Sequence, residues 1–497
     1  MKKIIIILFI AFIGLNFFSC SKPENEVKPG INSITSSELM ETVNYLSSDN
    51  LKGRLSGSEG YDKAAEFMAD QFKSLGLSPA IGDDYMQYLK VEYNEITAPC
   101  ELNLMEDNGN ETEFYLGEHF VCRGFTGSGN FTAPVAFCGY GISRPDIGYD
   151  DYKDIDVKGK VVMVFKYNPN WTINENVWST NYPREKSFTA AQHGAVGILF
   201  VSAPNNEPVQ PTIGSILAGK GEQNENFPQL HIDVPVAEKF LTSSEKSLSQ
   251  LQTIIDESKK PASFSLTSNA KININANYTK EKTTENVAAL LEGSDPELKN
   301  EYLVIGAHLD HVGSQGDEII FPGANDNASG SAAVLEIAEA FIESCVQPKR
   351  SILFVLFASE ELGLNGAYHF VENSPVPIEN IVAMLNLDCI SIGDSIRVGG
   401  GGISKNLWAL ANSEDEKLSD MMISETWPGG GADATPFFEK DIPTLFFVTT
   451  NGYAHLHYMT DKPETLEPDL FEKVVKLAYV TSYEIAMGNY DKENLER

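Results

Sequence analysis

The second half of the chain alternates between short apolar runs and amphipathic segments. Runs without polar interruption are typical of strands that are buried on both faces of a mainly parallel sheet. Residues 328–345 instead repeat their apolar side chains at helix spacing and are predicted to form a helix. The alternation begins at about residue 280 and predicts an α/β fold, a three-layer α/β/α sandwich with a mainly parallel central sheet. Its four predicted strands are residues 302–307, 352–358, 381–387 and 443–448.

The first half of the chain shows two different patterns of apolar and polar residues. Residues 36–51 and 58–76 follow helical periodicity, and Gly76 directly follows the last apolar position, as a C-terminal cap does. From about residue 94 to 270, short apolar runs are separated by Gly, Pro and Asn, and these runs predict strands. We find no constellation of His, Asp and Glu in this middle region of the sequence. The clearest of its strands are residues 133–138, 160–165 and 196–201.

The first twenty residues predict an exported protein. Two lysines precede an apolar run at residues 4–18, which suits a signal peptide and is short for a membrane span. Cys20 follows a small residue at the end of this run and resembles the acylated cysteine of bacterial lipoproteins. We therefore expect residues 1–19 to be a signal peptide and residues 20–35 to be a polar linker that is lipid-anchored in the cell envelope through Cys20. The alternative is a soluble secreted protein.

Composition narrows the class of partner. The chain has 497 residues, 42% hydrophobic and 22% charged, which is ordinary for a globular protein. Asp and Glu number 70 against 37 Lys and Arg, which gives a formal net charge of -33. Because nucleic-acid binding needs clustered cations, no nucleic-acid partner is expected, and electrostatic docking on anionic lipid is disfavoured as well. The sequence has no CxxC pair, so a zinc site built from thiolates is not expected.

Candidate metal ligands follow the predicted strands. The carboxyl ends of the strands of an open parallel sheet meet at one crevice, where functional groups gather. In this chain a His, Asp or Glu follows every one of the four predicted strands. These residues are His308, Asp310 and His311 after the first strand, Asp326 before the helix, Glu360 and Glu361 after the second strand, Asp388 after the third, and His455, His457 and Asp461 after the fourth.

The chemistry of these residues suits a pair of metal ions. Imidazole nitrogens and carboxylate oxygens without a thiolate suit a catalytic divalent site, with Zn²⁺ as the first choice. Two His and three carboxylates exceed what one tetrahedral zinc with an open position requires, but they suffice for two ions that share a bridging carboxylate. Of the adjacent Glu360 and Glu361, one can bind metal while the other stays free as a general base. Asp310 can hold the second ring nitrogen of His308.

Five short segments resemble the motifs of one enzyme family. They are residues 308–313 (HLDHVG), 323–330 (GANDNASG), 359–363 (SEELG), 386–388 (NLD) and 457–461 (HYMTD). Together they resemble the di-zinc aminopeptidases of metallopeptidase family twenty-eight, which includes bacterial leucyl aminopeptidases, aminopeptidase Y, glutamate carboxypeptidase and, more distantly, glutaminyl cyclase. Asn325 stands where this family commonly has Asp. Residues 431–437 resemble its substrate loop, with Ala434 in place of the usual His.

The resemblance extends to the first half of the chain. Gly53-Arg54 is similar to the N-terminal helical part of the same enzymes, and residues 149–152 and 156–161 look like a protease-associated (PA) domain inserted into them. The resemblance implies residues 36–93 as N-terminal helices of the peptidase domain, residues 94–270 as an inserted β-rich PA domain, and residues 271–490 as the zinc peptidase catalytic domain.

The resemblance also implies an activity and a role for each site residue. The activity is that of an aminopeptidase with two Zn²⁺ ions, which removes N-terminal residues from peptides by attack of a metal-bridging hydroxide. The implied roles are His308 and Asp388 as ligands of one zinc, Glu361 and His457 as ligands of the other, Asp326 as the bridging ligand, Glu360 as the general base and Asp310 as the residue that orients His308.

Two assignments among the histidines stay open at this point. His455 competes with His457 as a ligand, and Asp461 four residues after His457 favours the latter. His311 is either a supporting residue of the site, a substrate contact or only part of a turn. The other histidines lack carboxylate company and are expected to be structural: His119, His193, His231 and His369.

Other functions on the same fold are the alternatives. A carboxypeptidase, a dipeptidase or a glutaminyl cyclase would keep the fold and change the chemistry. A carboxypeptidase needs an Arg cluster for the terminal carboxylate of its substrate, and near the motifs the sequence offers only Arg350 and Arg397. A non-catalytic binding protein is disfavoured because the ligand set and Glu360 are intact.

Overall fold

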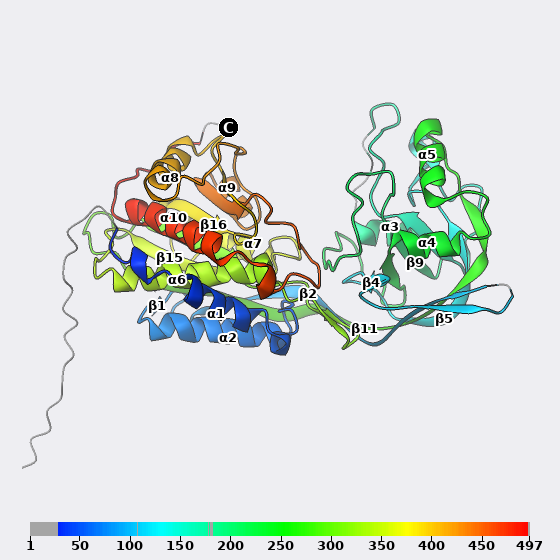
Figure 1. Cartoon of the computed structure of the whole chain (residues 1–497), viewed down its shortest axis with the longest axis horizontal. Coiled ribbons are helices and arrows are strands. Elements are labelled where there is room, and N and C mark those ends of the chain that lie inside the picture. The colour runs from blue at the N-terminus through cyan, green and yellow to red at the C-terminus, as the bar shows by residue number, and fades with distance from the viewer. Residues whose placement is uncertain (1–27, 107, 177, 179–181, 496–497) are drawn as a thin grey trace, which may run out of the picture.

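The computed structural model describes residues 28–106, 108–176, 178 and 182–495. The predicted signal peptide and Cys20 lie outside the described residues. Figure 1 shows two units side by side, joined by a long two-stranded ribbon of β2 (Met86–Met105) and β11 (Phe264–Leu291). None of the described helices is both long and apolar enough to span a membrane.

The first unit is built around a sheet with the strand order β17-β18-β16-β12-β15-β11. The four central strands are parallel, and the edge strands β17 and β11 run antiparallel to their neighbours. All four strands predicted from apolar runs are confirmed to within one residue. Their bounds are β12 (Tyr302–His308), β15 (Ser351–Phe357), β16 (Ile381–Leu387) and β18 (Thr444–Thr449), with β17 at Ile396–Gly399.

Helices cover both faces of this sheet because both faces of its strands are apolar. In β12, Ile305 belongs to the core on one face and Val304 to the core on the other. The predicted three-layer α/β/α sandwich is therefore confirmed. The larger core contains α1 (Ser36–Leu46), α2 (Glu59–Ser74), α6 (Ser329–Glu343), α8 (Lys405–Leu418) and α10 (Pro468–Ala486), and the smaller core contains α7 (Asn365–Glu372) and α9 (Ala434–Glu439).

The two N-terminal helices begin and end where the sequence signals indicate. Thr35 and Ser58 cap α1 and α2, each accepting a hydrogen bond from the main-chain N–H three residues further on. Gly76 follows α2 with a φ of 77°, the left-handed conformation that glycine adopts at little cost. The apolar face of α1 packs against α6 and α10, and that of α2 against β11 and α6.

The second unit continues the same sheet through the ribbon. From β11 the strand order runs β5-β8-β9-β10-β4, and β5, β8, β9 and β10 are parallel. The described part of this unit also contains three helices, so its architecture is α/β. The sequence pattern predicts strands here and does not indicate these helices. Its elements are β3 (Glu111–Phe114), β4 (Phe120–Cys122), β5 (Gly129–Phe137), β8 (Val161–Phe165), β9 (Gly197–Val201), β10 (Gln229–Ile232), α3 (Pro183–Gln192), α4 (Val234–Phe240) and α5 (Leu248–Ser258).

The two strands of the ribbon belong to both units. β2 and β11 pair antiparallel from Met86 opposite Val287 to Met105 opposite Asn269. The expected domain limits at residues 94 and 270 therefore fall inside two continuous strands and not in loops. The ribbon carries the chain out to the second unit and back to the sheet that holds the candidate site.

Candidate metal centre

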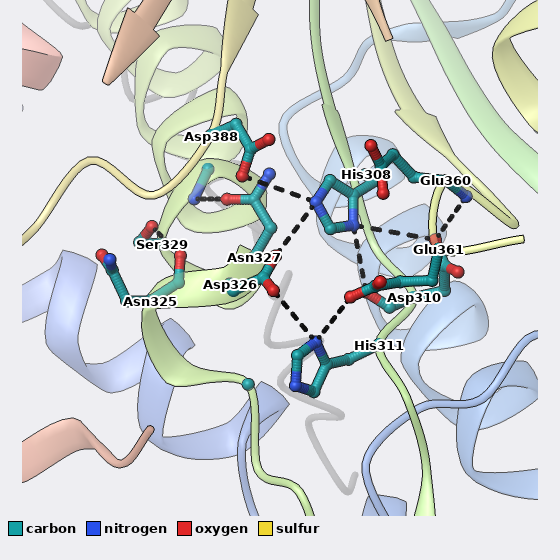
Figure 2. A network of polar contacts seen from close by, with 12 residues as sticks. His308, Asp310, His311, Asn325, Asp326, Asn327, Ser329, Glu360, Glu361 and Asp388 are labelled. Carbon is teal, nitrogen blue, oxygen red and sulfur yellow. Dashed lines mark hydrogen bonds and ion pairs between the residues drawn. The ribbon is translucent and has the colours of Figure 1, made fainter. Parts of the chain in front are cut away.

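The structure brings the five predicted metal ligands together at the carboxyl edge of the parallel strands. His308 is the last residue of β12, and Glu361, Asp388 and His457 follow β15, β16 and β18. Asp326 lies just before α6, and Figure 2 shows it between His308 and His311. The clustering follows from the parallel topology, which turns the carboxyl ends of neighbouring strands to the same edge.

One half of the cluster is centred on His308. Its Nε2 atom lies 3.3 Å from Oδ1 of Asp326 and 3.5 Å from Oδ1 of Asp388 (Figure 2). All three side chains are buried, and their ligand atoms lie close enough together to hold one metal ion.

The other half of the cluster contains two histidines. His457 places Nε2 2.9 Å from Oε2 of Glu361 and 3.3 Å from Oδ2 of Asp326. His311 places Nδ1 3.0 Å from Oε1 of Glu361 and 3.5 Å from Oδ2 of Asp326. Asp326 thus turns one oxygen to each half of the cluster, the arrangement of a bridging ligand. The structure also resolves the position of His311, which lies inside the cluster.

Several of these atoms are buried without a hydrogen-bond partner among the described residues. They are Nδ1 of His311, Oδ2 of Asp326, Oε1 of Glu361 and Oδ1 of Asp388. Buried polar atoms are normally hydrogen-bonded, and orphaned ones are costly. Two divalent cations, one in each half of the cluster, would satisfy all four, and nitrogen and oxygen donors of this kind suit Zn²⁺. The residues therefore fit a metal pair.

The electrostatics of the cluster favour ionised carboxylates beside imidazoles. Burial opposes ionisation of Asp326, but His311, His308 and His457 outweigh it and hold its pKa well below the usual range. Burial likewise opposes ionisation of Glu361, but His457 and His311 lower its pKa to about 2. These two carboxylates thus keep the charge that metal ligation requires.

Asp461 positions the bridging carboxylate. Its Oδ1 and Oδ2 atoms accept hydrogen bonds from the main-chain N–H groups of Asn325 (2.8 Å) and Asp326 (3.0 Å). The competing histidine, His455, contacts the hydroxyl of Thr460 at 2.9 Å instead of a carboxylate of the cluster. The choice of His457 over His455 therefore agrees with the geometry.

Asp310 contacts His308 through its main-chain oxygen and not, as expected, through its carboxylate. The Nδ1 atom of His308 lies 3.1 Å from the main-chain oxygen of Asp310, whereas the Asp310 carboxylate is farther away, at 3.7 Å. That carboxylate accepts a hydrogen bond of 3.1 Å from the main-chain N–H of Glu360 (Figure 2). Asp310 thus fixes the ring of His308 through its backbone and holds the strand end that carries Glu360 through its side chain.

Glu360 is the carboxylate that the cluster leaves free. Burial raises its pKa well above the usual range, and the nearby charges of Glu361, Asp433 and Asp388 add to this rise against the opposing effect of His308. A carboxyl group with a raised pKa beside a metal centre is suited to accept and return a proton.

The remaining histidines have contacts of their own outside the cluster. His193 stacks on Tyr152, with ring centres 4.5 Å apart, and Nε2 of His231 lies 3.3 Å from the hydroxyl of Ser202. His119 and His369 contact neighbours on their own local segments.

A family model matches the part of the chain that holds the metal cluster. Residues 286–481 match the family model described as peptidase family M28. The unit that holds the metal cluster is therefore similar to peptidase family M28, and we call it the M28 unit. The matched range starts near the end of β11 and runs into α10, so it contains every residue of the metal cluster.

Curated proteins similar to this chain include two from bacteria. Leupeptin-inactivating enzyme 1 of Streptomyces exfoliatus is 41% identical over 109 residues, which are 22% of this chain and 23% of the relative. Aminopeptidase YwaD of Bacillus subtilis is 28% identical over 197 residues, which are 38% of this chain and 41% of the relative. The matches thus span less than half the length of these relatives.

Among solved structures, a zinc aminopeptidase from Bacillus subtilis shares the fold of this chain. The TM-score is 0.62 at 19% sequence identity, and the superposition covers 93% of this chain and 98% of the other. Because the identity is low, the likeness concerns the fold, and it extends over both units.

A buried arginine binds the backbone of the segments that carry the metal cluster. Arg54 is fully buried and donates hydrogen bonds to the main-chain oxygens of Leu309 (2.9 Å), Pro322 (2.8 Å) and Gly323 (2.9 Å). These carbonyls belong to the two segments that carry His308 and Asp326. Burial lowers the pKa of Arg54 to about 10, so the guanidinium remains charged at neutral pH. A single Arg in a turn gives no sequence signal of this role.

The second unit reaches the metal centre through one loop. Gly214 contacts both the main chain and the ring of His457. Around it, apolar residues of the second unit pack against Val312 and Phe321 of the M28 unit. The residues from the second unit are Val121, Phe125, Ile216 and Ala218. The contact between Gly214 and His457 joins residues 243 positions apart, so no local sequence pattern predicts it.

Proposed function

We propose that this protein is a zinc-dependent aminopeptidase that hydrolyses N-terminal residues from peptides. The observation that carries the proposal is the buried double cluster of imidazoles and carboxylates around Asp326 in an M28 peptidase unit. Two similar proteins support the proposal. One curated relative is named an aminopeptidase, and one solved structure with the same fold is that of a zinc aminopeptidase.

The proposed centre would hold two zinc ions, and Asp326 would be a ligand of both. His308 and Asp388 would hold the first ion, and Glu361 and His457 the second. Bound at these positions, the ions would supply a Lewis acid for the scissile carbonyl and a lowered pKa for water.

The chain's own residues would move the proton and orient the ligands. We assign Glu360 as the group that takes a proton from the attacking water and returns it to the leaving amine, because its raised pKa suits both transfers. The main-chain oxygen of Asp310 holds the Nδ1–H of His308 and so leaves Nε2 free for metal.

The acidic groups around the centre suit a substrate ammonium better than a substrate carboxylate. Asp433 is fully buried near the cluster, and Glu360 and Glu361 are further acidic groups there. The two arginines that a carboxypeptidase would need are occupied elsewhere. Arg350 donates to Glu301 and to main-chain oxygens near the C-terminus, and Arg397 pairs with Glu425.

The second unit, which we propose to be a PA domain, would narrow the entrance to the centre. Its loop at Gly214 lies against His457, which favours short peptides over folded proteins as substrates. We further propose that the protein is exported and anchored to the cell envelope through Cys20, with secretion in soluble form as the alternative.

Amino-acid release from short peptides tests the proposed activity. The series contains each peptide with a free and with an acetylated N-terminus, incubated with zinc-loaded protein and with its Glu360→Gln variant. We expect release of the first residue from the free peptides alone and loss of release in the variant. Release of the last residue from acetylated peptides would make the enzyme a carboxypeptidase. Release from neither set by a zinc-loaded protein would contradict the proposal.

A further inference from the structure

We propose that the second unit holds a binding site for a small oxyanion, phosphate or a short carboxylate, between the side chains of Arg123, Lys166 and His231. These three basic residues are buried together on one face of the second unit's sheet. The site lies outside the metal centre, and the inference does not depend on the proposed peptide hydrolysis.

The register of the parallel strands places Lys166 and His231 on the same face. His231 in β10 pairs with Phe200 of β9, and Phe200 pairs with Val164 of β8. Lys166 follows Val164 by two positions, and its N–H continues the ladder by donating to the main-chain oxygen of Val201 at 2.8 Å. Because side chains two positions apart along a strand point to the same face, Lys166 and His231 share that face.

Arg123 joins them from the neighbouring antiparallel strand. It directly follows β4, and its N–H donates to the main-chain oxygen of Gln229 at 2.9 Å. Gln229 lies two positions before His231 in β10, so Arg123 faces the same side of the sheet. Arg123 and Lys166 are also the two charges that act on His231. The three basic groups are therefore neighbours.

Arg123 carries a charge that its surroundings leave unpaired. The residue is only 4% exposed. Its Nη2 atom donates to the hydroxyl of Ser215 at 3.0 Å, whereas Nε and Nη1 have no hydrogen-bond partner in the described part of the chain. Burial lowers the pKa of Arg123 to about 10, so the guanidinium is charged at neutral pH. A buried guanidinium with open donors is costly unless an anion meets it.

Lys166 and His231 add two further basic groups, and their polar partners are neutral. Lys166 donates to the amide oxygen of Gln210 at 2.6 Å. His231 has Nε2 3.3 Å from the hydroxyl of Ser202, and its Nδ1 has no partner among the residues described. Burial and the charge of Arg123 lower the pKa of Lys166 well below the usual range, and burial lowers that of His231 likewise. An anion would remove the penalty that both groups meet when charged.

A small oxyanion supplies what the three side chains lack. Hydrogen bonds from cationic side chains to carboxylate or phosphate oxygens are roughly twice as strong as those between neutral groups. The guanidinium in particular matches the planar geometry of these anions. Because the three residues are at most 5% exposed, the site suits a small free anion better than the carboxylate at the end of a peptide.

One loop joins this site to the metal centre. Residues 202–228 contain neither helix nor strand and connect β9 with β10. Within them, Ser215 accepts the hydrogen bond from Arg123 and directly follows Gly214, whose main-chain oxygen lies 3.1 Å from Nδ1 of His457. An anion bound at Arg123 would thus steady the loop that contacts a proposed metal ligand.

Thermal unfolding of the full-length protein tests the inference. Sodium phosphate or sodium acetate replaces sodium chloride at constant ionic strength and neutral pH. We expect about 50 mM phosphate to raise the midpoint by at least about 3 °C, as binding with a millimolar dissociation constant would. Phosphate can also stabilise the protein through zinc or by exclusion from its surface, so variants decide which site is responsible.

Methionine variants remove one charge each at similar size. Arg123→Met and Lys166→Met should lose most of the phosphate-dependent rise. Without phosphate or acetate, each should unfold at or above the midpoint of the unaltered protein, because the charge that it removes has no counter-charge there. The matched control is Arg144→Met, which removes a surface arginine of the same unit that pairs with Asp146 and should keep the full rise.

Crystals of the unaltered protein grown with phosphate give a readout that needs no variant. We expect density for the anion within hydrogen-bond distance of Arg123 and Lys166. The full phosphate-dependent rise in both methionine variants, or no anion density between these side chains, would overturn the site. Stabilisation by a peptide with a free C-terminus that neither phosphate nor acetate reproduces would overturn the choice of a small free anion.

Discussion

Gly214 and His457 are tied by two reciprocal contacts. The Nδ1 atom of His457 lies 3.1 Å from the main-chain oxygen of Gly214, and the N–H of Gly214 donates to the main-chain oxygen of His457 at 3.0 Å. An Nδ1–H held by a carbonyl leaves Nε2 free to bind metal and fixes the plane of the ring. The second unit therefore contributes directly to the orientation of a proposed metal ligand in the M28 unit.

Substitution of Gly214 should weaken the metal centre from a distance. A Cβ atom at this position would lie 2.8 Å from Val312 and 3.0 Å from Phe321, too close for either. Gly214→Ala should therefore push the loop away from His457 and lower zinc affinity or kcat/KM by about 10- to 100-fold. Zinc titration and peptide hydrolysis measure the two effects. Gly197→Ala in β9 is the matched control, because its Cβ would make only ordinary contacts from 3.4 Å outward. Equal behaviour of the two variants would contradict a role for the loop.

Removal of the free carboxylate should abolish turnover and spare the metals. Glu360→Gln keeps the size of the side chain and loses its capacity to take a proton. We expect kcat to fall by about 10²- to 10⁴-fold while the number of bound zinc ions stays the same. Steady-state kinetics and metal analysis of the same preparation check both statements. A kcat within tenfold of the unaltered enzyme would assign the proton transfer to another group.

Arg54 should matter for stability as well as for metal binding. Lysine keeps the charge, but its single ammonium cannot donate to carbonyls on several sides as the guanidinium does. Because buried main-chain oxygens are left without donors, Arg54→Lys should destabilise the fold by about 2 to 4 kcal/mol and weaken zinc binding. Calorimetry with and without zinc measures this. Arg144→Lys should have little effect, since Arg144 pairs with Asp146 at the surface.

Glu336 should make stability depend on pH. It is buried in α6 with one carboxylate oxygen unpaired, and burial raises its pKa from 4.5 to about 8, with Glu339 and Glu38 adding to the rise. The folded chain thus binds this proton more tightly than the unfolded chain. The associated stability is fully present below pH 4.5 and is lost as the pH rises through about 8.

The variant Glu336→Gln should remove that dependence. Its thermal midpoint should exceed that of the unaltered protein by about 3 °C above pH 8, with the difference shrinking toward zero near pH 4.5. Differential scanning calorimetry across this pH range provides the measurement. Glu343→Gln serves as the control, since Glu343 is exposed at the end of the same helix. A difference between Glu336→Gln and the unaltered protein that does not change with pH would contradict the explanation.

The parts predicted well from the sequence are those that one local pattern specifies. The run at residues 381–387 is apolar throughout, and the structure has β16 at these same residues. The gathering of His308, Asp326 and Asp388 followed from a general property of parallel sheets and needed no knowledge of loop conformation. The choice between His455 and His457 depended on the spacing to Asp461, whose carboxylate indeed holds the segment of Asp326.

The parts that escaped prediction depend on contacts between distant segments. His311 could not be placed because the direction of its ring depends on Arg54, which binds the backbone of His311 from another part of the chain. Gly214 carries no side chain, so no residue pattern could connect it with His457. The limits of the inserted unit could not be predicted either, because β2 and β11 each run through both units without a break.

The continuity of β2 and β11 also determines how the chain could be shortened. Tyr93 and Thr279 face each other across the ribbon, with the whole second unit beyond them. A tight turn that joins these two positions would close a hairpin and keep the pairing of β11 with β15, whereas a cut at residues 94 and 270 would leave two strand ends of unequal length. Such a shortened chain would retain every residue of the metal cluster. It would lack the Gly214 carbonyl that contacts His457 and the apolar residues of the second unit that pack against Val312 and Phe321. Comparison of zinc affinity between the shortened and the full-length chain would then measure what the second unit contributes to the metal centre.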